Sequence, residues 1–225
     1  MRVCGFLCNA DKQKHTNLSL VSCLLSLSCF LFLVSSPLAA NECLKYKMLP
    51  SLEIKVPSFS VSVVQPERKM DLLHGNVVST MAEEYEISYG AQKAAGGYCV
   101  FIEHIAATIG YTDFVVQIDK RHPRDSCEWR AIKEHEDEHI RAHLSVVEDG
   151  TDDIRRAVAG AANNLMPVLA ESEDGIDGAM DKLESDLESQ PQIKLMRQKL
   201  NAEQEIRNKK IDLDDKGWRI RACGG

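Results

Sequence analysis

The pattern that most constrains this chain is a pair of histidines four residues apart, His135 and His139, with Glu136 between them. Residues four apart stand one above the other on the same face of an α-helix, so both imidazoles can bind one metal ion. Glu136 then lies beside that ion, where its carboxylate can take a proton from a bound water. This H-E-x-x-H pattern is typical of zinc hydrolases. It predicts that His135 and His139 bind Zn²⁺ and that Glu136 is a catalytic base.

The residues around the pattern predict a helix over 129–147, which contains neither Pro nor Gly and which Asp125 or Ser126 can cap. At about 100° per residue, Glu136 falls near the centre of an apolar stripe. A carboxylate buried there without a partner is costly or shifts its pKa, and a metal-bound water would supply the partner. The alternative is an ordinary solvated helix that binds no metal. The stripe consists of Trp129, Ile132, Glu136, Ile140, His143 and Val147.

The third metal ligand is open at this stage. Catalytic zinc usually takes three protein ligands and keeps a fourth position for water, and the pattern supplies two. His143 lies about 12 Å from His135 along a straight helix, too far for both to reach one ion. We therefore expect His143 in the core or behind the metal ligands. The candidates are His104, His122, His143, Asp152, Asp153, Glu171 and Glu173.

The N-terminus predicts export. Residues 17–40 carry no charge, follow a basic start and end in Leu-Ala-Ala, as in a secretory signal peptide over residues 1–40 that is cleaved after Ala40. The alternative is an uncleaved anchor, because the uncharged run is almost long enough to span a bilayer. Cleavage predicts a periplasmic or secreted protein without stable membrane insertion.

The charge of the remaining chain excludes some classes of partner, and its cysteines predict disulfides. Without residues 1–40 it holds 24 basic and 33 acidic residues, a net charge of −9, which argues against nucleic acid and anionic membranes as partners. An even number of cysteines in an exported chain predicts disulfides, with three pairings open. Our hypothesis pairs Cys99 with Cys127 and Cys43 with Cys223.

The order of predicted elements indicates an α+β fold with a small antiparallel sheet, followed by the motif helix and a helical C-terminal half. We expect a catalytic domain over 41–178 and a helical extension over 179–225. The predicted strands are 52–64, which Pro57 interrupts, and 81–88, which could also be helix. Two further strands, 98–107 and 112–118, are predicted to form a hairpin at Gly110-Tyr111, after a turn at Gly96-Gly97. The predicted later helices are 151–165, 179–188 and 191–210.

With strands, then an H-E-x-x-H helix, then further helices, the chain resembles the zincin metallopeptidases. Residues 96–143 are similar to a group of small exported bacterial zinc proteases. The resemblance implies an exported zinc hydrolase that acts on a peptide or protein substrate, with His135 and His139 as ligands and Glu136 as general base. The residues that carry it are Gly97-Tyr98-Cys99, the hairpin after them, Ser126-Cys127-Glu128, and His135-Glu136-Asp137-Glu138-His139.

The chain departs from the extended patterns of that group. After His139 it reads Ile140-Arg141-Ala142-His143, which lacks the Gly and the third His of the metzincins. The Gly150-Thr151-Asp152-Asp153 stretch is locally similar to that of the aspzincins but lies close to the motif. The resemblance therefore implies no third ligand.

A second hypothesis belongs to a different class of protein. The chain could be a non-catalytic periplasmic interaction or scaffold protein whose helices over 179–210 bind a partner or self-associate. The motif would then be a structural metal site, or no metal site at all. Closed structural zinc sites have four ligands and no open position, so the number of ligands distinguishes the two hypotheses.

Overall fold

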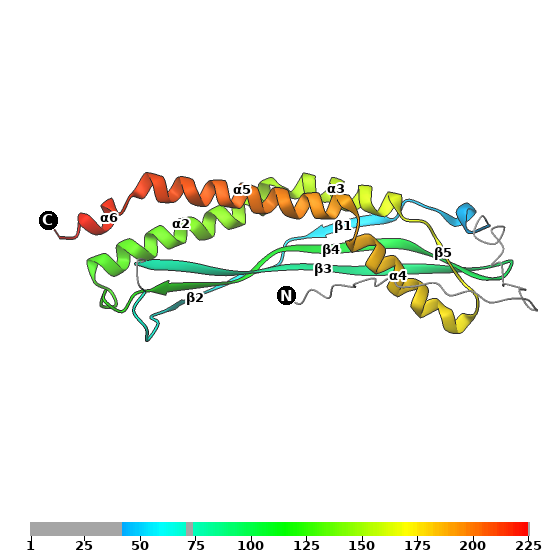
Figure 1. The fold of residues 1–225 in the computed structure, drawn as a ribbon, viewed down its shortest axis with the longest axis horizontal. Helices are drawn as coiled ribbons and strands as arrows, with labels where there is room; N and C mark the ends of the chain where they lie inside the picture. The colour runs from blue at the N-terminus through cyan, green and yellow to red at the C-terminus, as the bar shows by residue number, and fades with distance from the viewer. Residues whose placement is uncertain (1–41, 71–73, 225) are drawn as a thin grey trace, which may run out of the picture. The chain divides into compact units, whose positions relative to one another are not determined.

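The computed structural model describes residues 42–70 and 74–224, while residues 1–41, 71–73 and 225 lie outside the described part (Figure 1). The predicted signal peptide and its cleavage after Ala40 therefore fall outside the described residues. Within the described part, no helix is both long and apolar enough to cross a membrane.

The described residues form an α+β fold, as predicted, with the longer strands first and most of the helices after them. The strands are β1 (Ser51–Lys55), β2 (Ser60–Val64), β3 (Gly75–Ala94), β4 (Gly97–Ile118) and β5 (Val168–Ala170). The α-helices are α2 (Cys127–Asp149), α3 (Thr151–Asn164), α4 (Ile176–Glu188), α5 (Pro191–Asp215) and α6 (Trp218–Arg221), and the short 3₁₀ helices are η1 (Leu44–Tyr46) and η2 (Glu173–Gly175).

The central strand of the sheet is β4. β3 pairs antiparallel with it along one edge, over the whole length of β3. Along the other edge lie β5, β1 and β2, of which β5 is antiparallel to β4 and both β1 and β2 are parallel to it. The sheet is therefore mixed, with three of its five strands running in one direction, and the predicted antiparallel sheet is wrong. β2 and β4 are parallel because the chain reverses twice between them, before and after β3.

The predicted hairpin at Gly110 is also wrong, because residues 97–118 form one strand and the chain reverses at Gly96 instead. Thr112 has no partner in β3, which marks a bulge in β4. Immediately before the bulge the inward-facing residues have odd numbers, and after it they have even numbers. One strand is predicted as two because Gly110 and Tyr111, between the two apolar runs, indicate a turn. A Cβ at Gly110 would lie 2.7 Å from Cδ of Pro57, between β1 and β2, so this glycine marks the close approach of a neighbouring segment.

The core lies against the sheet, and the helices α2, α3, α4 and α5 all contribute buried apolar residues to it (Figure 1). Ile105, Ile109 and Phe114 of β4 are fully buried in it. α2 contributes the apolar stripe predicted from the sequence, including the buried Ile132 and Ile140. Burying a large apolar side chain stabilises a fold by about 1.5–3 kcal/mol. The apolar face of β4 thus determines which side of α2 turns inward, and with it the orientation of the histidine pair.

The helix α5 is longer than predicted. The sequence predicts an end near Lys210, but the helix runs to Asp215 and stops where Lys216 and Gly217 adopt left-handed backbone conformations. α5 contacts both α2 and α3, so the predicted C-terminal extension, residues 179–225, packs against the motif helix. Its last turn lies where the histidine pair points.

Two disulfides join the four cysteines of the described residues, but not in the predicted pairs: Cys43 bonds to Cys99, and Cys127 bonds to Cys223. Cys99 lies near the start of β4 and Cys127 lies beyond its end, about 60 Å away at the rise of an extended strand. The predicted bond between them is therefore out of reach. Cys127 meets Cys223 because α5 returns antiparallel along α2, and α6 after it lies beside the start of α2.

Candidate metal centre

The helix α2 directs the histidine pair at the end of α5. Ser126 caps α2, and its hydroxyl accepts a hydrogen bond of 3.1 Å from the backbone N–H of Trp129, as predicted. Regular helical geometry then stacks His135 and His139, whose Nε2 atoms lie 3.1 Å apart. Their side chains are 18% and 12% exposed. The two imidazoles therefore converge on one position, as the motif predicts.

Asp212, near the end of α5, completes a group of three. Its Oδ1 lies 3.3 Å from Nε2 of His135 and 3.2 Å from Nε2 of His139. Donors placed about 2.0–2.1 Å from a tetrahedral zinc ion are roughly 3.3–3.4 Å apart. The three atoms thus have nearly the spacing of three corners of such a site. His135, His139 and Asp212 could hold a metal ion.

The second nitrogen of each imidazole faces an oxygen. Nδ1 of His139 lies 3.0 Å from Oδ1 of Asn208. Nδ1 of His135 lies 2.8 Å from Oδ2 of Asp215, which is ion-pair distance, although the two groups are not aligned for a hydrogen bond. Protons held on these Nδ1 atoms leave both Nε2 lone pairs directed at each other and at Asp212. Such a cluster is repulsive unless a cation, either a proton or a metal ion, lies at its centre.

Glu136 is buried beside this group, with 5% of its surface exposed. Among the described residues, no hydrogen bond or ion pair reaches its carboxylate. Burial is the main cause that raises the pKa of Glu136 to about 7, while the charge of His139 opposes the rise and the charges of Asp212 and Asp137 add to it. A carboxyl group that titrates near neutral pH can both accept and return a proton.

The first residue of β3 makes room for this carboxylate. A Cβ on Gly75 would lie 2.6 Å from Oε1 of Glu136 and 2.4 Å from Cγ2 of Ile132. Both contacts are shorter than van der Waals packing allows, so a larger residue at this position would force Ile132 and Glu136 to shift.

Gly75→Ala is therefore expected to displace Glu136 and to lower the free energy of unfolding by about 1–3 kcal/mol, the usual cost of overpacking. Urea denaturation measures this loss. The matched control is Gly178→Ala on α4, where a Cβ meets nothing within 4 Å. It should raise stability by up to about 1 kcal/mol, because alanine favours the helix. Equal stabilities of the wild type and Gly75→Ala would contradict the close approach.

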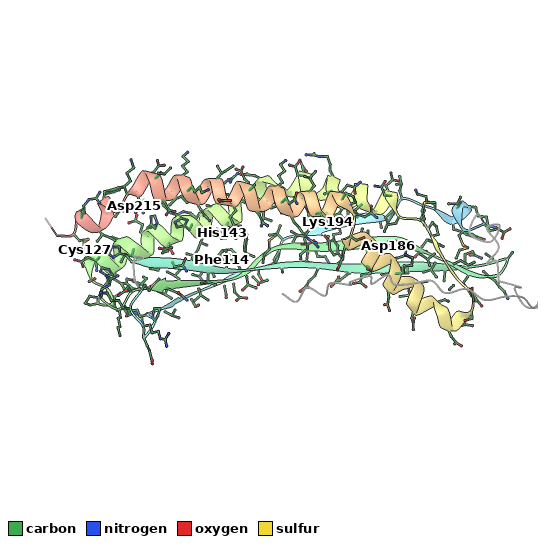
Figure 2. The ribbon with its side chains drawn as sticks, in the orientation of Figure 1. Phe114, Cys127, His143, Asp186, Lys194 and Asp215 are labelled. Atoms are coloured by element: carbon green, nitrogen blue, oxygen red, sulfur yellow. A yellow bond between two sulfur atoms is a disulfide. The ribbon has the colours of Figure 1, made fainter. Side chains whose placement is uncertain are left out.

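The three candidate ligands and Glu136 line one pocket with a volume of about 470 Å³, within the range of small-molecule sites. The walls come from α2, the start of β3, the end of α5, and α6. Figure 2 labels Asp215 at this end of α5 and Cys127 at the start of α2. Elements far apart in the sequence thus enclose the site.

His143 belongs to the core rather than to the group of ligands, as its helical spacing predicts. Its ring is buried, 5.8 Å from that of Phe114 between centroids (Figure 2). Its Nε2 lies 3.0 Å from Nε2 of Gln204 and 3.3 Å from Nδ2 of Asn208. Tyr111 of β4 donates a hydrogen bond to Gln204. Burial lowers the pKa of His143 to about 4, so the neutral ring can accept these bonds. The network ties β4 to Asn208, and Asn208 contacts His139, one of the candidate ligands.

None of the other predicted candidates for the third ligand belongs to the group within the described residues. Three have different partners: His104 lies beside Ser51, His122 beside His74, and Asp153 beside Arg156 and Lys199. The others, Asp152, Glu171 and Glu173, are exposed.

Sequence reasoning missed Asp212 and Asp215 because the predicted helix ended before them. A signal was nevertheless present, since Asn208, Asp212 and Asp215 recur at the spacing of one helical face. That spacing has meaning only if the helix continues to Asp215, as α5 does.

No family model matches the chain, and neither a curated protein nor a solved structure matches it. The resemblance to zincin metallopeptidases therefore remains a prediction. The function of the site has to be inferred from its geometry and its chemistry.

Proposed function

We propose that the protein is an exported zinc-dependent peptidase in which His135, His139 and Asp212 hold the metal and Glu136 is the general base. One observation carries the proposal: three donor atoms converge at 3.1–3.3 Å from one another, in a pocket that also contains a buried glutamate. Three protein ligands with a fourth position open are typical of catalytic rather than structural zinc.

Zinc at this position would polarise the scissile carbonyl group and activate water. Glu136 would accept a proton from the attacking water while the water oxygen bonds to the carbonyl carbon. It would return that proton to the amine as the C–N bond breaks. Asn208 and Asp215 would keep the imidazoles of His139 and His135 in the orientation that presents Nε2 to the metal.

We propose zinc rather than iron because of Glu136, which lies beside the three candidate ligands. Two imidazoles and one carboxylate form the ligand set of some zinc hydrolases and also of non-haem iron oxygenases. Hydrolysis requires a group that takes a proton from water, and Glu136 lines the same pocket as the three ligands. This favours a hydrolase. The two disulfides are compatible with the oxidising periplasm or extracellular space, where the substrate would be a peptide or protein.

Glu136→Gln is expected to reduce peptide hydrolysis by at least about 100-fold, because the amide has nearly the same shape but cannot accept the proton. Zinc content should stay unchanged. Hydrolysis is measured on a quenched fluorescent peptide library, and zinc is measured by mass spectrometry. The matched control is Glu134→Gln, an exposed glutamate on the same helix that should retain activity. Turnover like that of the wild type in Glu136→Gln would rule out Glu136 as the base.

A second candidate function is a non-catalytic interaction or scaffold protein. It is favoured by three exposed apolar side chains on α5, Leu195, Ile206 and Leu213, which could contact a partner or a second copy. Analytical ultracentrifugation tests it. A dimer that dissociates when these three residues are replaced by serine, in a protein that hydrolyses no peptide, would favour this function over the peptidase.

A further inference from the structure

We infer that the disulfide between Cys127 and Cys223 controls metal binding by holding Asp212 against the histidine pair, so that its reduction by a dithiol weakens the site. The inference rests on the proposed metal centre. It adds regulation of that centre by the redox state of the protein.

The segment that carries Asp212 has little apolar anchoring of its own. The buried apolar residues of α5 are Ile193, Met196 and Leu200, all in its first half. Beyond them, Asp215 is the only buried residue of α5. Asp212 itself is 63% exposed, so no packing around its side chain holds it in place.

Noncovalent contacts attach this end of α5, and α6 after it, to the motif helix. Apart from contacts with the histidine pair, Arg219 on α6 lies 2.6 Å from Glu138 on α2, and the half-buried Ile220 of α6 packs against the core. The disulfide is the covalent attachment, and it joins residues 96 positions apart in the chain. Closing so long a loop restricts the free chain strongly. Opening it leaves the segment that carries Asp212 attached to α2 by these noncovalent contacts alone.

The two disulfides differ in access. Cys43 and Cys99 are 1% and 0% exposed. Cys127 is exposed and Cys223 half-buried, and both line a hollow of about 360 Å³ together with Trp218. A dithiol can therefore reach the bond beside the metal centre while the other bond stays shielded.

The position of Cys127 also favours exchange, because it is the first residue of α2 and a thiolate is stabilised at a helix N-terminus. A thiolate of the dithiol attacks Sγ of Cys223, the S–S bond breaks, and Cys127 leaves as a thiolate. The second thiol of the reagent then attacks the mixed disulfide and releases Cys223. Two electrons pass to the protein, the two thiol protons end on its two cysteines, and the reagent becomes a disulfide.

The test compares the zinc affinity of the full chain, measured by competition with a chromophoric chelator, in three oxidised proteins. They are the wild type, Cys127→Ser/Cys223→Ser, and the control Cys43→Ser/Cys99→Ser. Serines are used because free thiols would themselves bind zinc. We expect zinc to bind about 10- to 100-fold more weakly to the Cys127→Ser/Cys223→Ser variant, the range seen when the support of metal ligands is lost. The control should keep the wild-type affinity.

The outcomes separate the inference from the proposed function. If the oxidised wild type binds no zinc, both the metal centre and its regulation are overturned. If all three proteins bind zinc equally tightly, the metal centre stands and its redox control is overturned.

A second measurement needs no variant. In wild-type protein treated with dithiothreitol, amide hydrogen exchange should accelerate over 208–221 while β4 stays protected. Alkylation should label Cys127 and Cys223 before Cys43 and Cys99. Equal acceleration in β4, or earlier labelling of the Cys43–Cys99 pair, would overturn the inference even if the serine variant did not fold.

Discussion

Replacing Asp212 or His139 with alanine is expected to lower the metal content of the purified protein from about one ion per chain to a small fraction of that value. Each change removes one of three converging donors and leaves two, which hold a metal ion far more weakly. Mass spectrometry of the protein, purified without a histidine tag and supplied with zinc, measures the content. The result would establish a metal centre that joins α2 to α5.

The control for this prediction is a neighbouring acid. Asp214 lies two residues from Asp212 on the same helix and is exposed, but it does not belong to the group of three. Asp214→Ala should therefore keep the metal content of the wild type. Equal retention of metal in Asp212→Ala and Asp214→Ala would show that Asp212 is not a ligand.

Phe114→Ala is expected to lower the free energy of unfolding by about 3–5 kcal/mol, because it leaves a cavity in the core. Phe114 is fully buried, and its ring lies 5.4 Å from that of Tyr111 and 5.8 Å from that of His143 between centroids. Chemical denaturation followed by circular dichroism measures the loss. The expected effect is the largest on stability because this side chain fills the space between β4, α2 and the polar network.

The matched control is Phe101→Ala on the same strand. Phe101 is half-buried and stacks on Tyr46 at 6.2 Å between ring centroids. Its replacement should cost clearly less, because the neighbouring groups and solvent can fill the space. Equal losses for the two variants would contradict the placement of the core on the face of the sheet that carries Phe114.

Much of the motif helix could be predicted because the physics there is local. The cap at Ser126, the apolar stripe and the buried position of Glu136 all follow from helical periodicity over neighbouring residues. The same periodicity stacks His135 on His139. The strands β1 and β2 correspond to the predicted strand over 52–64, which Pro57 interrupts.

Predictions that depended on pairing between distant segments failed. Strand direction, the place of the hairpin and the disulfide pairs depend on which segments lie side by side, and short-range periodicity carries no such information. Gly110 in particular indicated a turn, so one strand appeared to be two, whereas this glycine lies where Pro57 approaches β4 closely. The pairing of Cys127 with Cys223 follows from the antiparallel course of α5 along α2.

A helix that presents two histidines and buries a glutamate can be inferred from the sequence alone, because neighbouring residues decide which way a helical side chain points. The meeting of these histidines with Asp212, on a helix more than 70 positions away, emerges only in the folded chain, as do the places of Asn208 and Asp215 behind the imidazoles. That meeting depends on α5 continuing to Asp215 and on its antiparallel course along α2. This course is set by the packing of α5 against α2 and α3 rather than by any local pattern.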